Sequence, residues 1–550
     1  MGTVIGETPP FAAGLRGRPN WPKEIVAGVT LAALAVPLNI GYAQIAGLPP
    51  VVGLYTAIVP LLVFALLCSS RQLVASPDAP IAALIASLLA AIIAKPGSPQ
   101  YVELAYAQAL VCAVVFLLFF IFKLGFLANF LSEPVLVGFI AGLAIEILTS
   151  QIEKILGIRT SADRFFPELW QIITQIPHAH GWSVAVGTAT MLVIVALRRS
   201  APALPGPLIA LIAATALVAW AGLDKHGVSI LGPVPSGLPT PHWPSVTLGQ
   251  WAALVPGAIA ICAVTLADGL LTARRYAEQH HYRLDANAEL RAFGLANIAA
   301  GLTQSMTIGS SASRTAAMDA TGSRSQVPSA VCAVVVAVLM AFFSGLLAYL
   351  PNAALAGIVA VAVIRLIDVR RFASLWRLRR SEFWIAVVCL LGVPVLGSLT
   401  AVIIAFLLSA VDVVRRASRP RTSTLQPGEH GRYVQPPRRG QAVGPLTIYR
   451  FENQLFFANA DTFKTEVTRL AEQGASWIVL DAEAITDVDT TGAQALHEVV
   501  RTLRERGVTF AVSRATTGLR DLLAHYGMTG LTFYDSNDAA AAAYQEIHHG

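Results

Sequence analysis

Apolar segments of membrane length follow one another from residue 26 to residue 414, and charged residues become frequent only beyond them. The chain is 55% hydrophobic and only 13% charged, about half the charged fraction usual in soluble domains. Segments near ~20 apolar residues predict helices that cross a bilayer. We count fourteen, near residues 26–45, 52–68, 79–94, 104–122, 133–152, 182–197, 206–222, 252–272, 288–303, 313–322, 327–349, 353–367, 383–397 and 398–414, with 163–176 as a candidate surface helix. The sequence therefore predicts an α-helical polytopic membrane protein.

Basic residues are unevenly shared between the two sides of this predicted membrane domain. The even-numbered loops hold Arg71, Lys123, Arg198, Arg199, Arg274, Arg275, Arg283, Arg291 and a cluster from Arg365 to Arg380, and the odd-numbered loops hold only Lys95, Lys154, Arg159, Arg164 and Lys225. Because cytoplasmic loops carry the excess of basic residues, we expect both termini in the cytoplasm and an inner (plasma) membrane protein. The same rule accounts for the net charge of +6, so no nucleic acid partner is expected.

Two of the segments, the third and the tenth, are too short to span and begin at small or helix-breaking residues. They start at Ser76-Pro77-Asp78-Ala79-Pro80 and at Gly309-Ser310-Ser311-Ala312-Ser313-Arg314-Thr315. Interrupted helices at corresponding places in two halves indicate a transporter site near the midplane, and seven plus seven segments predict an inverted repeat. Helix N-termini present free N–H groups and a positive dipole end, so the expected ligand is a small inorganic or organic anion.

Ionisable residues are rare inside the apolar segments and are therefore candidates for function. Asp268 must be neutralised by a proton, a cation or a basic partner, and Thr272, one turn later, could share a Na⁺ ion with it. A hydrogen-bonded structural aspartate is the alternative. Arg314 either steers the anion, or pairs with Asp268, Asp319 or backbone carbonyls and supports the site. Tyr42 either lines the cavity or packs as an ordinary core residue.

Beyond the membrane segments, the pattern changes to that of a soluble domain. We divide the chain into a cytoplasmic tail (1–20), a transport domain (21–416), a linker (417–444) and a cytoplasmic α/β domain (445–550). In the last part the predicted strands and helices alternate: Leu446–Phe451, Ala460–Gln473, Trp477–Leu480, Thr491–Arg506, Val508–Ser513 and Thr516–His525. The five cysteines lack metal-like spacing, so we expect no metal or cofactor apart from H⁺ or Na⁺ as a coupling ion.

The sequence resembles the sulfate permease (SulP) family of anion transporters over nearly its whole length. The most specific matches are Ala46-Gly47-Leu48-Pro49-Pro50-Val51-Val52-Gly53-Leu54-Tyr55, Ser69-Ser70-Arg71-Gln72-Leu73, Asn287-Ala288-Glu289-Leu290 and Ser313-Arg314-Thr315-Ala316. The resemblance implies a core domain that moves against a gate domain as an elevator. It implies substrate between the two half-helices, near Asp78, Ala79, Ala312, Ser313 and Arg314, with Tyr42 at an aromatic cavity position. Asp268 and Thr272 match the Na⁺ positions of bicarbonate-importing members, and proton-coupled members also carry an acid there.

The soluble part resembles a STAS domain through Asp489-Thr490-Thr491-Gly492. In related anti-sigma-factor antagonists the residue matching Thr491 is a phosphorylated hydroxyl, so Asp489 and Thr491 are candidate regulatory residues; a helix N-cap is the alternative for Thr491. The resemblance also implies a homodimer and a cytoplasmic partner for this domain. One departure concerns the first-span proline, which the family usually follows with Gln and this chain follows with Leu38.

Together these patterns predict a secondary active transporter of sulfate, bicarbonate or a dicarboxylate. A nucleobase permease of the same fold is one alternative, although it would not need Arg314 or a STAS domain. A membrane-anchored signalling protein that acts through its STAS domain is another. An enzyme is not expected, because the sequence has no nucleophile–base constellation, metal cluster or phosphate-binding loop.

Overall fold

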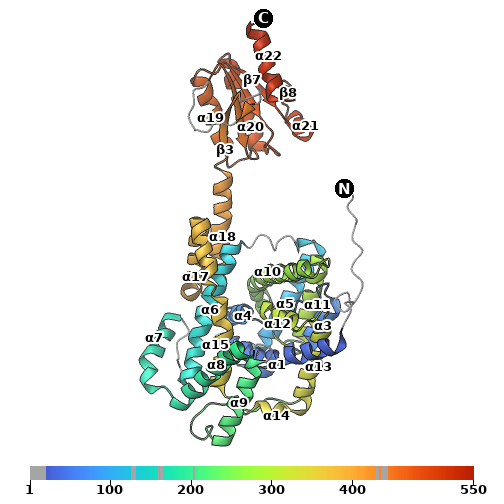
Figure 1. The fold of residues 1–550 in the computed structure, drawn as a ribbon, viewed down its shortest axis with the longest axis vertical. Helices are drawn as coiled ribbons and strands as arrows, with labels where there is room; N and C mark the ends of the chain where they lie inside the picture. Colours follow the sequence, from blue (N-terminus) through green and yellow to red (C-terminus); the bar gives the residue numbers. More distant parts are fainter. Residues whose placement is uncertain are drawn as a thin grey trace. The chain divides into compact units, whose positions relative to one another are not determined.

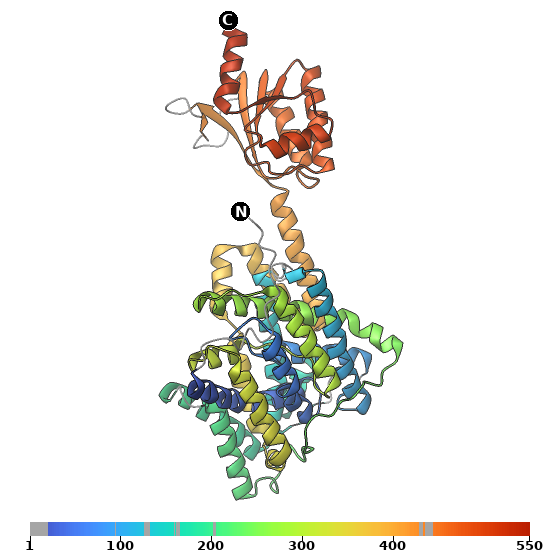
Figure 2. The same ribbon diagram turned by 90° about the vertical axis from the view of Figure 1, so that its right-hand side faces the viewer.

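The computed structural model describes residues 20–93, 95–125, 132–158, 160, 165–201, 205–427, 433–434 and 444–549. The predicted tail 1–20, except for Asn20, and part of the predicted linker 417–444 lie outside these residues. The chain forms two compact units, which divide between Leu407 and Leu408. Figures 1 and 2 show the first unit as a bundle of helices and the second as a sheet flanked by helices.

Each of the fourteen predicted segments corresponds to helical structure, and the last of them, in α18, continues past Leu407 into the second unit. The helices are α1 (Trp21–Ile45), α2 (Pro50–Thr56), α3 (Val59–Leu67), α4 (Ala79–Ile92), α5 (Pro99–Ile121), α6 (Glu133–Leu156), α7 (Phe165–Gln175), α8 (Gly181–Ser200), α9 (Gly206–Ala221), α10 (Leu248–Gln279), α11 (Ala286–Leu302), α12 (Ala312–Ala320), α13 (Val327–Phe342), α14 (Ser344–Leu347), α15 (Asn352–Val363), α16 (Val369–Leu378), α17 (Arg380–Leu396) and α18 (Ser398–Ala417). By length and composition, seven described helical stretches can cross a membrane, and α4, α9 and α13 are shorter apolar helices. The predicted α-helical membrane fold is thus confirmed.

The second predicted segment differs from expectation because it is broken into α2 and α3. Ile58 separates them with a non-helical backbone (φ −103°, ψ −90°), and Pro60 follows in the first turn of α3. Because proline has no N–H, Pro60 cannot donate to the Thr56 carbonyl as the continuation of α2 would require. Apolar composition continues through this point, so hydropathy alone did not reveal the break.

The packing of several helix pairs repeats when each helix is replaced by its counterpart seven segments later. Thus α1 packs on α13 as α10 packs on α5, and α6 packs on α17 as α15 packs on α8. The half-helices obey the same rule, since α12 contacts α1 as α4 contacts α10. Because seven is odd, the two halves cross the membrane in opposite senses, as an inverted repeat requires.

The second unit is an α/β domain with a mixed sheet of strand order β4-β3-β5-β6-β7-β8. Strands β5 (Leu446–Glu452), β6 (Trp477–Asp481), β7 (Thr509–Ser513) and β8 (Thr532–Tyr534) run parallel, and β3 (Arg421–Pro427) pairs antiparallel with β5. Figure 2 shows α22 (Asn537–His549) on one face of the sheet, where Ala540 and Tyr544 pack with Trp477. On the other face α19 (Ala460–Glu472), α20 (Thr490–Glu505) and α21 (Thr517–His525) enclose the larger core.

The predicted linker 417–444 needs a correction, because part of it belongs to the sheet. Arg421 to Leu425 pair with Glu452 to Ile448, and the short β4 (Tyr433–Val434) pairs with the end of β3. The sequence Thr422-Ser423-Thr424-Leu425 contains β-branched residues that suit a strand. The neighbouring Arg and Pro residues concealed this short pattern.

Candidate functional site

A two-stranded sheet brings the starts of the two half-helices together. β1 (Ala75–Ser76) pairs antiparallel with β2 (Gly309–Ser310), with Ala75 opposite Ser310 and Ser76 opposite Gly309. Gly309 is required at this crossing, because an added Cβ would lie 2.1 Å from Cδ1 of Ile81 and 2.8 Å from Oγ1 of Thr265. Helix α4 begins three residues after β1, and α12 begins two residues after β2. Two helix N-termini therefore meet in the interior of the membrane unit.

The two N-termini differ in the hydrogen-bond donors that they leave available. At α4, Asp78 is the N-cap and its carboxylate accepts a hydrogen bond from the Ala79 N–H at 2.8 Å, while Pro80 has no N–H. At α12, Ser311 occupies the cap position and makes no side-chain cap. Among the described residues, the N–H groups of Ala312, Ser313 and Arg314 find no acceptor. An anion would thus find most of its backbone donors at α12.

Arg314 lies behind this N-terminus and is only 1% exposed. Its guanidinium donates to Ser76 Oγ, to the Pro77 carbonyl at 3.0 Å and to Asn39 Oδ1 at 2.7 Å. Of the supporting partners predicted for it, only the backbone carbonyl is found, because Asp319 instead pairs with His280 and Arg324. All three acceptors are uncharged, and no carboxylate of the described residues lies within 4.0 Å of the guanidinium. The positive charge of Arg314 therefore has no ion-pair partner there.

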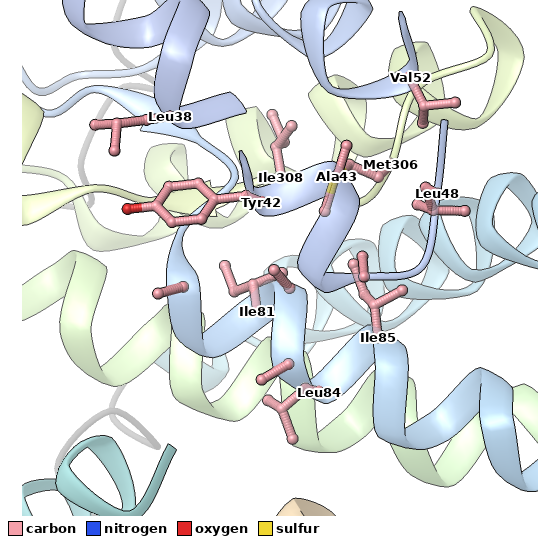
Figure 3. Packing of buried hydrophobic residues seen from close by; sticks show 14 of the residues in the cluster. Leu38, Tyr42, Ala43, Leu48, Val52, Ile81, Leu84, Ile85, Met306 and Ile308 are labelled. Carbon is pink, nitrogen blue, oxygen red and sulfur yellow. The ribbon is translucent and has the colours of Figure 1, made fainter. Parts of the chain in front are cut away.

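Tyr42 stands beside the same guanidinium on α1. The Cζ atom of Arg314 is 5.6 Å from the centroid of the Tyr42 ring. Figure 3 shows Leu38 and Tyr42 on α1, with Ile81 of α4 nearby. Leu38 and Tyr42 are one turn apart on the same face of α1, so the apolar residue found in place of the family's glutamine lies next to the aromatic ring.

Asp268 approaches the site from α10 and contacts the second half-helix segment. Its Oδ2 accepts a hydrogen bond from Ser310 Oγ at 2.7 Å, and no Lys, Arg or His nitrogen of the described residues lies within 4.0 Å of it. Thr272 lies one turn further along α10, half-buried. Among the described residues, no three His, Cys, Asp or Glu side chains gather as metal ligands. Among the described residues, Ser310 supplies the one side-chain hydrogen bond to the Asp268 carboxylate.

A cavity of about 790 Å³ joins most of the predicted site residues. Tyr42, Asp78, Asp268, Ala312, Ser313 and Arg314 all line it, whereas Ala79 and Thr272 do not. These polar groups are contributed by α1, α10 and α12 and by Asp78 at the start of α4. The described lining residues that come from α6, α8, α9 and α15 and the segments next to them are apolar apart from Arg198 and Arg365, namely Ile140, Ile194, Pro205, Gly206, Pro207, Ile358, Val361, Ala362 and Leu366.

Sequence reasoning missed the residues that hold the predicted ones in place. Asn39 accepts from Arg314 and donates to Thr56 Oγ1 at 3.2 Å, and Ser310 holds Asp268. Asn39 is fully buried in α1, and a buried amide in an apolar helix is the signal that marks such a partner. Its pairing with Arg314 spans 275 residues, so no local pattern could have revealed it.

The candidate regulatory residues lie at the start of α20 in the second unit. Asp489 is the N-cap: its Oδ1 accepts from the Gly492 N–H at 2.7 Å and its Oδ2 from the Phe457 N–H at 2.9 Å. Thr491 lies in the first turn with an exposed side chain, so Asp489, and not Thr491, caps the helix. The Thr491 hydroxyl therefore remains accessible.

A central cavity at two half-helix starts, inside a bundle with inverted-repeat packing, defines a membrane transporter. The chain belongs to the sulfate permease family, whose model matches residues 22–389, and a STAS domain matches residues 437–540. The chain is 40% identical over 506 residues to a Mycobacterium tuberculosis protein named "Probable sulfate transporter" (91% of this chain, 90% of that protein). It is 28% identical over 513 residues to "Probable sulfate transporter 3.3" of Arabidopsis thaliana (88% and 81%). The expected family is confirmed, and the protein is a transporter and not an enzyme.

Solved structures support the same fold. The murine Slc26a9 anion transporter in its inward-facing state superposes with a TM-score of 0.87 at 24% identity, covering 95% of this chain and 91% of that one. The transmembrane domain of a cyanobacterial bicarbonate transporter superposes with a TM-score of 0.63 at 21% identity, covering 71% of this chain and 99% of that one. At these identities the likeness concerns the fold.

Proposed function

We propose that this protein is a secondary active transporter of a small anion, with sulfate as the first candidate. The observation that carries the proposal is the start of α12, where three N–H groups without acceptors and the unpaired charge of Arg314 meet at one cavity. Charge-assisted hydrogen bonds from a guanidinium and from backbone amides suit a tetrahedral oxyanion. A neutral nucleobase offers no negative charge to Arg314 or to the N–H groups at the start of α12, which disfavours that alternative.

The choice of sulfate rests on the relatives, several of which are named as sulfate transporters. Bicarbonate and a dicarboxylate remain alternative substrates for the same donors. In this proposal the anion contacts the Ala312, Ser313 and Arg314 amides, with Tyr42, Asp78 and Ala79 nearby.

Uptake of an anion into a cell works against an interior-negative potential, which costs about 2.3 kcal/mol per charge per 100 mV. A co-transported cation offsets this cost. We assign its binding to Asp268, either as H⁺ on the carboxylate or as Na⁺ shared with Thr272. The contact from Ser310 supports this assignment, because it links the coupling carboxylate to the strand that precedes α12.

Alternating access by an elevator motion is the transport mechanism that we propose. Support comes from the elements that line the cavity, since the polar groups come from α1, α4, α10 and α12, whereas the described lining residues from α6, α8, α9 and α15 are nearly all apolar. A polar site can slide along an apolar wall without breaking hydrogen bonds to it. We further propose that the protein lies in the plasma membrane with both termini cytoplasmic, that it forms a homodimer, and that the STAS domain receives a regulatory partner or a phosphate at Thr491.

Reconstitution into liposomes tests the substrate and the coupling ion. Uptake of labelled sulfate, bicarbonate and fumarate would be compared under separate H⁺ and Na⁺ gradients. We expect sulfate uptake driven by one of the gradients. In Asp268→Asn we expect this uptake to be lost, and the exchange of sulfate in the absence of an ion gradient to be retained. Uptake of none of the three by folded protein would refute the proposal, and unchanged gradient-driven uptake in Asp268→Asn would remove that residue from coupling.

A further inference from the structure

Asp78 is a carboxylate inside a cavity that we assign to an anion. It lies between β1 and α4, lines the cavity, and accepts the Ala79 N–H at 2.8 Å. An ionised carboxylate has no proton to donate to an anion, and it repels one at short range. Its presence beside Ala312, Ser313 and Arg314 therefore needs a role other than direct contact with substrate.

The charges around Asp78 are few and can all be named. Tyr42 faces it from α1, Arg314 from α12 and Asp268 from α10, and the other charged residues that line the cavity are Arg198 and Arg365, both exposed. No Lys, Arg or His nitrogen of the described residues lies within 4.0 Å of the Asp78 carboxylate. Arg314 comes near without pairing, because it donates to the carbonyl of Pro77, the residue before Asp78.

Arg314 and Asp78 thus carry opposite charges in one cavity without forming an ion pair. Burying a guanidinium without a counter-ion inside a membrane costs free energy. The empty carrier is therefore stabilised when a carboxylate in the same cavity is ionised. When an anion arrives, it supplies the negative charge itself, and an ionised Asp78 would then be excess. Protonation of Asp78 as the anion binds removes one of the negative charges that would otherwise gather around a single guanidinium.

We propose that Asp78 is a second proton-coupling residue, which is ionised in the empty carrier and protonated when the anion is bound. This inference rests on the proposed anion site. In the step, one H⁺ from solution forms an O–H bond on the carboxylate oxygen that does not face Ala79, and no other covalent bond changes. The oxygen that caps Ala79 keeps its role in both states, so the proton enters without unwinding α4.

This role differs from that of Asp268, which Ser310 holds against the other half-helix segment. Asp78 competes with the anion, because the negative charge of its carboxylate and that of the anion are both attracted by the positive charge of Arg314. The arrangement makes an anion bring one proton into the site. Each sulfate then carries one positive charge in addition to the ion bound at Asp268.

Proton counting during sulfate binding tests the inference in full-length protein. Sulfate would be titrated calorimetrically at about pH 6, 7 and 8 in buffers of different ionisation enthalpy, which yields the number of protons taken up per sulfate. Asp78→Asn keeps an oxygen to cap α4 but cannot ionise, and Asp78→Ser is a second neutral cap. Asp224→Asn, an exposed carboxylate in a turn, is the matched control.

We expect both Asp78 variants to bind sulfate with up to one fewer proton than wild type. The sulfate affinity of wild type should change with pH more steeply than that of the Asp78 variants, by up to about tenfold per pH unit, while Asp224→Asn behaves as wild type. Unchanged proton uptake in both variants would overturn the inference and leave the anion site standing. Loss of sulfate binding at every pH in folded Asp78 variants would also overturn it, because the carboxylate would then be needed for the bound state. Absence of sulfate binding in wild type would refute the proposed function and this inference together.

Discussion

At the scale of single residues, the site is organised by one guanidinium. Arg314 holds α12 against the Ser76–Pro77 segment and against Asn39 of α1, and no carboxylate of the described residues pairs with its charge. A planar guanidinium reaches these acceptors at once, whereas a lysine ammonium is a point charge on a flexible stem. Arg314 can therefore support the site and attract the anion together.

Substitution of Arg314 separates these two contributions. We expect Arg314→Ala to weaken sulfate binding by at least about tenfold, because one charge-assisted interaction of about 1.5–3 kcal/mol is lost. The sulfate affinity of Arg314→Lys should lie between those of wild type and Arg314→Ala, since lysine keeps the positive charge and lacks the planar set of guanidinium donors. Binding of sulfate to the three purified proteins measures the effect, and equal affinities would show that the charge has no part in recognition.

Residue types in the broken segments were sufficient to predict where the cavity would form. They did not predict which side chains hydrogen-bond to the site residues and fix their positions. Asp78, Ser313 and Arg314 follow from local patterns of helix breakers and small residues. The partners Asn39 and Ser310 depend on tertiary contacts between segments that are far apart in sequence, which no local pattern encodes.

At the scale of elements, the small β1–β2 sheet sets the geometry. Its strands are two residues each, yet they fix the register between the two half-helices. The interruption of each helix was predictable from Pro77, Pro80 and the Gly309–Ser311 run. The strand pairing was not predicted, because two-residue strands have no periodicity to detect. The same limit concealed β3 within the predicted linker.

Gly309→Ala tests the close crossing of β2 over α4 and α10. The added Cβ would overlap Ile81 and Thr265, so we expect a loss of roughly 1–3 kcal/mol in stability and a lower melting temperature. Gly249→Ala is the matched control, because nothing lies within 4 Å of its added Cβ at the start of α10. Thermal unfolding in detergent measures both variants. Equal melting temperatures would mean that the crossing is looser than described.

In the STAS domain, Tyr449 couples β5 to α19 in a pH-dependent way. Its hydroxyl donates to Glu466 Oε2 at 2.8 Å, and burial, with a smaller effect of the Glu466 charge, raises the pKa of Tyr449 well above its usual range. Because the folded pKa is raised, the stabilising contribution is complete below the unfolded value of about 10 and is lost as pH rises above it.

We therefore expect Tyr449→Phe to lower the stability of this unit by about 1 kcal/mol at neutral pH, with a smaller further loss than wild type above about pH 10. Hydrogen exchange of β5 and β6 amides in the full-length protein would report it. Tyr534→Phe is the control, because its side chain makes no hydrogen bond with a described residue. The same alkaline loss in Tyr449→Phe as in wild type would assign the effect to another group.

At the scale of the whole molecule, the arrangement of charges predicts its orientation. Asp224 lies in the loop after α9, which is an odd-numbered loop. Arg377 lies in the basic segment after α15, which is an even-numbered loop. All five native cysteines are buried, so an introduced exposed cysteine would be the main target of a thiol reagent.

We expect a membrane-impermeant thiol reagent added outside intact cells to label Asp224→Cys and not Arg377→Cys. In inside-out vesicles the pattern should reverse, because the two positions face opposite sides. Labelling of Arg377→Cys from outside would place the termini outside the cytoplasm and refute the predicted orientation.

The strand pairing and hydrogen bonds that join the two half-helices have a consequence for energy conversion. Because β1, β2 and Arg314 bind the ligand-bearing segments to one another, the site has little freedom to become weaker on the inner side than on the outer side. A coupled carrier concentrates its cargo only through the free energy of its co-transported ions, so its accumulation ratio is fixed by the ion gradient, the membrane potential and the stoichiometry. A carrier with equal affinity on both sides also works as readily in reverse, so a collapsed gradient would turn the same molecule into an exporter.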